Sequence, residues 1–176
     1  MDSRQLASAV GQRIRELRRD RGISLSGLAA AAGIGKGSLS ELEAGTRNPT
    51  LATLYALAGP LGVPLGTMLL DEVGTVVSSD GVSGRLLDVR RYPGGTRETY
   101  CLDLDAGARR VSPAHGDGVR EHVLVTAGSL VAGPLGAEVS CPAGSTISWT
   151  SDVAHSYRAE SGAVSSILVV CTPTLE

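Results

Sequence analysis

The stretch Ser24–Gly45, SLSGLAAAAGIGKGSLSELEAG, decides the fold of the first part of this 176-residue chain. Its apolar side chains form two short runs at helical spacing, and Gly33 between them can end a helix by adopting the left-handed conformation. We predict one helix capped by Ser24 and a second over about residues 36–44. Two short helices joined by a tight turn are the packing unit of a helix-turn-helix.

Helical periodicity extends outward from this stretch over residues 1–70. After Asn48-Pro49, Thr50 is predicted to cap a further helix, which Pro60 should kink or end early because proline lacks a backbone donor. A last helical turn follows Pro64. Before Ser24, the first helix of the chain carries an apolar stripe of Leu6, Val10, Ile14 and Leu17. We therefore predict a compact domain of five short helices over residues 1–70.

The second part of the chain has a different pattern. Residues 71–84 are rich in Gly, Ser and Asp, and we predict that they form a linker. From residue 85 onward short runs alternate apolar and polar side chains, which predicts an all-β sandwich or barrel over residues 85–176. The expected fold class is thus α+β with two domains. The predicted strands are 85–92, 98–104, 121–126, 129–132, 145–149, 153–158 and 163–171.

Charge and composition limit the partners and the compartment. Residues 1–70 carry eight basic and five acidic side chains, whereas residues 71–176 carry eight and thirteen. We therefore expect only the first part to contact a polyanion. No apolar run approaches the roughly 18 residues of a membrane span, and the N-terminus lacks an apolar signal core. We expect a cytoplasmic protein with no membrane partner, in which three cysteines are small buried apolar residues: Cys101, Cys141 and Cys171.

The spacing of Leu, Ala, Gly, Glu and Pro from Ser24 to Leu54 resembles the DNA-binding domain of the XRE (Cro/CI-type repressor) family. The resemblance covers about residues 8–70 and implies a lambda-repressor-like domain whose helix 36–44 enters the major groove of double-stranded DNA. Lys36 can donate to guanine and Glu41 can accept from cytosine. The side chains expected to be exposed on this helix are Lys36, Ser38, Ser40 and Glu41, and the residues expected nearest base edges are Lys36, Gly37 and Glu41. The expected phosphate contacts are Ser24, Arg47, Asn48 and Thr50.

The same resemblance has two further implications. One domain contacts a single half-site, which gives too little affinity and specificity for a genome, so we expect a homodimer on a two-fold operator. Arg18 and Glu43 match positions that pair across the domain in this family, and we interpret them as structural. Three other arginines on the first helix are interpreted as ordinary charged surface: Arg13, Arg15 and Arg19.

A second informative stretch is His115–Gly128, HGDGVREHVLVTAG, which resembles the first motif of the cupin family. Pro142-Ala143-Gly144, followed eleven residues later by His155, resembles the second motif. The resemblance covers about residues 85–172 and implies a jelly-roll (double-stranded β-helix) barrel. Asp117 stands in place of a motif histidine, and Ala159 stands where an asparagine often closes the second motif.

Strand alternation predicts which of these side chains share a face. His115 and Asp117 are two residues apart, and Glu121 points with Val123 into the barrel, so His122 points outward. Two imidazoles and two carboxylates suit one divalent Mn, Fe, Zn or Ni ion. The predicted ligand set is His115, Asp117, Glu121 and His155. A metal-free polar pocket is the alternative, and Trp149 and Tyr157 either line the pocket or belong to the core.

Three functions are compatible with this sequence. The first is a transcriptional regulator whose β-domain senses a small-molecule effector and dimerises the chain. The second is a metal-dependent dioxygenase or isomerase fused to a DNA-binding domain, and the third uses the β-domain as a passive dimerisation module. We favour the sensor and expect no enzymatic activity, because the motif lacks its second histidine and no catalytic residue is assigned.

Overall fold

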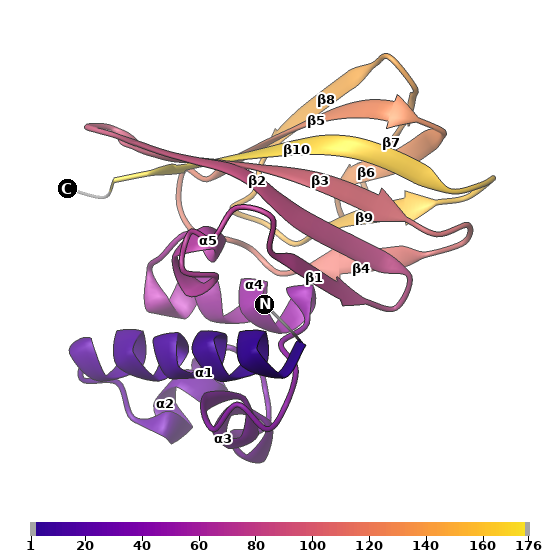
Figure 1. Ribbon diagram of the computed structural model, residues 1–176. Coiled ribbons are helices and arrows are strands. Elements are labelled where there is room, and N and C mark those ends of the chain that lie inside the picture. The colour runs from indigo at the N-terminus through magenta and orange to yellow at the C-terminus, as the bar shows by residue number, and fades with distance from the viewer. Residues whose placement is uncertain (1–2, 175–176) are drawn as a thin grey trace. The chain divides into compact units, whose positions relative to one another are not determined.

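The computed structural model describes residues 3–174 and contains two compact units that divide between Asp71 and Glu72 (Figure 1). Within residues 3–174, no helix combines the length and the apolar character that crossing a membrane requires.

The first unit contains the five predicted helices. Ser24 Oγ accepts a hydrogen bond from the Gly27 amide and Thr50 Oγ1 accepts one from the Thr53 amide, so both predicted N-caps form. The fourth helix ends one residue after Pro60. The helices of the described chain are α1 (Ser3–Asp20), α2 (Leu25–Ala31), α3 (Lys36–Glu43), α4 (Leu51–Leu61) and α5 (Leu65–Met68).

Helices α1 and α3 pack so closely that glycine is required at the contact. A Cβ atom added at Gly11 would lie 2.1 Å from the backbone oxygen of Leu42. One added at Gly45, which follows α3 with a φ of +70°, would lie 2.7 Å from the Cα of Ser8. Because these neighbours are backbone atoms, they cannot rotate away from an added methyl group. The two glycines therefore set the spacing between the first helix and the helix-turn-helix.

An ion pair also joins these two helices. Arg18 Nε lies 2.6 Å from Glu43 Oε1 and Arg18 Nη2 lies 2.8 Å from Glu43 Oε2, which makes the pair bidentate. A third nitrogen of Arg18 donates to the carbonyl of Ile23. The two side chains are only 12% and 7% exposed. The pair is thus largely shielded from solvent, and it links α1, the turn after it and α3.

The second unit consists of two antiparallel sheets. The six-stranded sheet has the order β1-β2-β3-β10-β5-β8, and the four-stranded sheet has the order β4-β9-β6-β7. Without β1 and β2, eight strands remain in two sheets of four, in the alternating order of a jelly roll. The predicted all-β jelly roll is therefore confirmed. The strands are β1 (Val76–Ser79), β2 (Val82–Tyr92), β3 (Gly95–Leu104), β4 (Arg109–Ser112), β5 (Arg120–Ala127), β6 (Ser129–Pro134), β7 (Val139–Pro142), β8 (Thr146–Thr150), β9 (His155–Ala159) and β10 (Val164–Pro173).

Residues 71–84 do not form the predicted linker. They contain β1 and the first residues of β2, which pair as a hairpin. The turn is Asp80-Gly81, with φ values of 52° and 74°, and the side chains of Val77 and Val82 are buried. Asp-Gly between alternating apolar residues is a strong hairpin signal, and it outweighs the linker-like composition.

Candidate functional site

Helix α3 exposes four of its five residues that we expect to contact DNA. Leu39 and Leu42 are buried against the rest of the helical unit, and Ser38 is half-buried. This placement fits a helix with one face available to DNA, although the individual contacts stay predictions. The exposed residues of α3 are Lys36, Gly37, Ser40 and Glu41.

Three of the expected phosphate contacts, Arg47, Asn48 and Thr50, follow α3, whereas Ser24 caps α2. Arg47 Nη1 lies 3.4 Å from Glu41 Oε2 and 3.3 Å from Ser38 Oγ, and these groups are exposed. Asn48 lines a groove of about 650 Å³. Arg4 lines the same groove, and the sequence did not identify Arg4 as a candidate site residue. No local signal marks Arg4, because only the packing of α1 beside α3 brings it to Asn48. The groove is lined by Arg4, Ala7, Gly45, Thr46 and Asn48.

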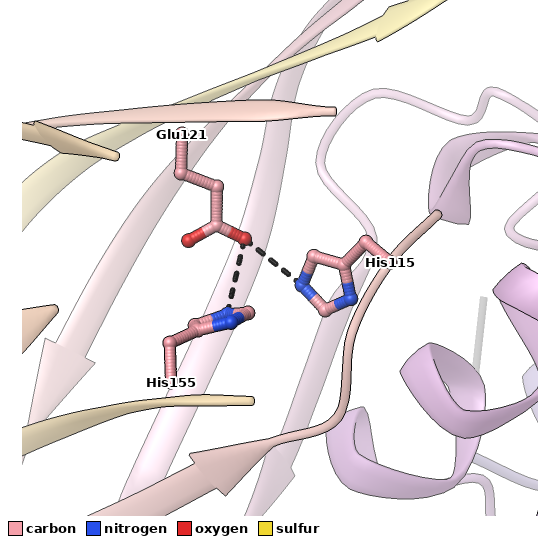
Figure 2. Close-up of side chains that lie close together, drawn as sticks. All are labelled: His115, Glu121 and His155. Carbon is pink, nitrogen blue, oxygen red and sulfur yellow. Dashed lines mark ion pairs between the residues drawn. The ribbon is translucent and has the colours of Figure 1, made fainter. Parts of the chain in front are cut away.

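Inside the β-unit, His115, Glu121 and His155 come together, and we call these three residues the triad. Their candidate ligand atoms all lie within 4.8 Å of one another. His115 Nε2 is 2.9 Å and His155 Nε2 is 3.4 Å from Glu121 Oε1. Figure 2 shows the carboxylate of Glu121 pointing toward both imidazoles. The three side chains are at most 4% exposed.

Each triad residue comes from a different element. Glu121 lies on β5, where alternation turns it inward with Val123 and leaves His122 exposed on the outer face. His155 begins β9 in the opposite sheet. His115 lies in the loop after β4, and its amide donates to the carbonyl of Ser151. The position of the triad therefore depends on both sheets and on the conformation of the loop that carries His115.

Asp117, the fourth predicted ligand, is not part of this cluster. It lies in a turn with its side chain exposed, between Gly116 with φ +120° and Gly118 with φ +72°. Our prediction assumed an extended chain, in which residues two apart share a face. The left-handed glycines break that alternation, so His115 points inward and Asp117 points outward.

The hydrogen bonds of His155 determine which of its nitrogens can bind a metal ion. His155 Nδ1 lies 3.0 Å from the carbonyl oxygen of Val153. A carbonyl oxygen only accepts hydrogen bonds, so Nδ1 carries a proton. In the neutral imidazole, Nε2 then has a lone pair that faces the carboxylate of Glu121. Two facing acceptors repel each other, so this contact requires a cation between them, either a proton or a metal ion.

Burial and charge act in opposite directions on the titration of this site. Burial raises the pKa of Glu121, but the neighbouring imidazoles of His115 and His155 lower it by more, so the pKa of this carboxyl lies below its ordinary value. Burial lowers the pKa of His115 below its usual value, although Glu121 beside it acts in the other direction. A neutral imidazole and an ionised carboxylate are the protonation states that bind metal ions.

Aromatic rings enclose the triad. The ring of Trp149 lies 5.7 Å, centroid to centroid, from both His155 and Tyr157. The hydroxyl of Tyr157 donates a short hydrogen bond to Glu121 Oε2. Trp149 is 6% and Tyr157 1% exposed. Both side chains therefore belong to the buried wall around the triad, and Tyr157 orients the carboxylate.

Four further polar side chains on the inner surface were missed by the sequence analysis. Glu98 lies on β3 in alternation with buried Tyr100, so the alternation that placed Glu121 inward also applied to Glu98. Arg110 lies opposite Tyr157 in the pairing of β4 with β9. No sequence signal marked β4, so its residues were not assigned. The four buried side chains are Glu98, Arg110, Ser112 and Ser151.

Comparisons with known proteins connect the two units to a family. A helix-turn-helix family model, HTH_3, matches residues 14–67. The HTH-type transcriptional regulator SutR of Escherichia coli (strain K12) is 31% identical over 157 residues, which cover 87% of this chain and 88% of that protein. The HTH-type transcriptional regulator SinR of Bacillus subtilis (strain 168) is 42% identical over 64 residues, or 36% of this chain and 57% of SinR.

A solved structure has the same fold over nearly the whole chain. The crystal structure of an HTH_3 family transcriptional regulator from Vibrio cholerae matches with a TM-score of 0.88 at 23% identity, covering 98% of this chain and 100% of that chain. The similarity to SutR is long enough to include both units. The chain therefore belongs to the HTH_3 (XRE-type) family of helix-turn-helix transcriptional regulators, and it joins a helix-turn-helix domain to a jelly roll.

Proposed function

We propose that this regulator binds a two-fold DNA site as a cytoplasmic homodimer, and that its barrel senses a small molecule without catalysing a reaction. The main support for this proposal is the triad, in which a fully buried carboxylate lies between two imidazoles. The same chain also contains a helix-turn-helix. The regulators among its relatives support the non-catalytic assignment. We further propose 1–70 as the DNA-binding part, with the sensor beginning at the hairpin of β1 and β2.

Regulation requires that the effector bind the DNA-competent and DNA-incompetent arrangements of the dimer unequally. In this proposal the ligand occupies the barrel and changes the spacing of the two recognition helices. The β-unit then supplies both the sensor and the contacts between the two chains.

The triad residues fit a divalent metal ion. Two imidazole nitrogens and one carboxylate form the donor set that binds iron, manganese, zinc or nickel. The lone pair of His155 Nε2 faces a carboxylate, and the Nδ1 hydrogen bond to Val153 fixes the ring orientation. A bound ion would act as a Lewis acid and hold an oxygen ligand. His115, Glu121 and His155 would hold that ion in the buried interior of the β-unit.

The metal content of the protein tests this assignment. We expect about one metal ion per chain after purification without chelator, measured by elemental mass spectrometry. Replacing His155 with alanine should lower the ratio severalfold, because it removes one of the three donor groups that would hold the ion. His122→Ala is the matched control, because His122 lies beside Glu121 on β5 but points outward.

Circular dichroism of each variant establishes that the β-unit is still folded. A ratio near zero in the parent protein, unchanged after incubation with Mn, Fe, Ni and Zn salts, would contradict a metal site.

Selection from a randomised DNA pool tests the proposed DNA contacts. We expect a two-fold symmetric site that binds two chains. The double replacement Lys36→Ala/Glu41→Ala should change the preferred bases, since both side chains are exposed on α3. Arg47→Ala should instead weaken binding to all sequences and reduce the salt dependence of log K by about one.

Arg19→Ala is the control for the general effect of removing a positive charge, because Arg19 lies on the exposed face of α1. It should leave the selected sequence and the salt slope nearly unchanged. If the double variant selects the same sequence as the parent protein, α3 is not the recognition helix.

A further inference from the structure

Three buried hydrogen-bonding side chains surround the triad, and we call Ser112, Trp149 and Ser151 the donor trio. Their polar atoms, two Oγ and the indole Nε1, have no hydrogen-bond partner among the described residues. Ser112 and Ser151 are fully buried, and Trp149 is 6% exposed. Because buried polar groups in folded proteins are nearly always hydrogen-bonded, the donor trio indicates a bound partner that completes these bonds.

Each member of the donor trio lies beside a different triad residue. Ser112 is the cross-strand partner of His155, and Trp149 is the cross-strand partner of Glu121. The carbonyl of Ser151 accepts the amide hydrogen of His115 at 2.8 Å. Three unsatisfied donors therefore belong to residues that adjoin the triad through strand pairing or a backbone hydrogen bond.

The chemistry of these groups selects an acceptor. An indole N–H only donates, and a serine hydroxyl can donate one hydrogen bond. A ligand that satisfies all three must therefore present several lone pairs within a small volume. A carboxylate does so, because its two oxygens accept about four hydrogen bonds and have no proton to donate.

The charge of the interior favours the same ligand. Arg110 is 7% and Glu98 1% exposed on the inner surface, and their formal charges cancel. The guanidinium carbon of Arg110 lies 5.7 Å from the centroid of the Tyr157 ring, whose hydroxyl binds Glu121. The three buried charged side chains Glu98, Arg110 and Glu121 alone carry a net charge of -1, and a divalent ion on Glu121 with neutral imidazoles would change it to +1. Buried charge requires a partner, and a monoanion supplies one.

We propose that the barrel binds a small organic monocarboxylate, whose oxygens accept hydrogen bonds from Trp149 Nε1 and from the hydroxyls of Ser112 and Ser151. This inference rests on the proposed sensing function and names the chemical class of the effector.

Trp149 provides a direct readout, because it is the only tryptophan in the chain. The experiment titrates metal-loaded full-length protein with propionate, pyruvate, lactate and benzoate, each paired with its neutral amide, and follows indole fluorescence. We expect at least one carboxylate to change the fluorescence saturably while its amide does not. The metal content is measured again after titration, so that extraction of the ion is recognised.

Variants assign the effect to the donor trio. For the carboxylate that binds, calorimetry should show dissociation constants raised roughly tenfold by Ser112→Ala, by Ser151→Ala and by Trp149→Phe, because each removes one charge-assisted hydrogen bond. Ser148→Ala is the control, since Ser148 is exposed on the same strand as Trp149. It should leave the constant unchanged.

The outcomes separate the ligand class from the sensing function. If no carboxylate alters the fluorescence, or if each amide binds as tightly as its acid, the carboxylate proposal is overturned and ordered water satisfies the donor trio. A neutral amide that binds and also changes affinity for the selected DNA would keep the sensor and reject its ligand class. A carboxylate that binds through the donor trio without changing DNA affinity would keep the ligand and reject sensing.

Discussion

Replacing Arg18 with methionine is expected to lower the free energy of unfolding of the helical unit by about 3–5 kcal/mol. The change leaves the carboxylate of Glu43, which is 7% exposed, without its bidentate partner in a buried position. It also removes the hydrogen bond to the carbonyl of Ile23. Urea unfolding of the full-length chain, followed by the helical signal in circular dichroism, measures the loss.

A second replacement separates the charge from the packing. In the double variant Arg18→Met/Glu43→Leu no buried charge is left unpaired, so most of the lost stability should return. The exposed pair Arg47–Glu41 is the control, because both side chains are more than half exposed. Glu41→Gln should change stability by about 1 kcal/mol or less. A similar small loss in Arg18→Met would show that the Arg18–Glu43 pair does not stabilise the unit.

Replacing Gly11 with alanine is expected to destabilise the helical unit by about 2–3 kcal/mol, despite the higher helix propensity of alanine. The added methyl group would lie 2.1 Å from the oxygen of Leu42, so α1 must move away from α3. Since about 1 kcal/mol shifts the midpoint of a small domain by roughly 4–8 °C, the helical thermal transition should fall by about 10–20 °C.

Gly37→Ala is the matched control, because a Cβ atom at Gly37 on α3 meets nothing within 4 Å. That change should stabilise the unit by up to about 1 kcal/mol through helix propensity alone. If Gly11→Ala behaved like Gly37→Ala, the close contact between α1 and α3 would not exist in solution.

Local patterns predicted much of the architecture. The caps at Ser24 and Thr50 depend on neighbours three residues away, and both form. The alternation of β5 depends only on the pleat, so it placed Glu121 inward and His122 outward. The same reasoning failed for Asp117, because two left-handed glycines interrupt the extended chain. The linker predicted for residues 71–84 was wrong for a different reason. Its Gly, Ser and Asp content is typical of a linker, although Asp80-Gly81 forms the turn of a hairpin.

The sequence by itself determined the two structural classes, the helix-turn-helix and three triad residues, because each depends on local periodicity or on a motif of fixed spacing. Only the tertiary structure decided what these residues contact. The burial of the Arg18–Glu43 pair depends on how closely α1 approaches α3. The donor trio surrounds the triad because β4, β5, β8 and β9 pair in one particular register. Pairing between distant segments depends on which surfaces fit together, and no local pattern records that fit.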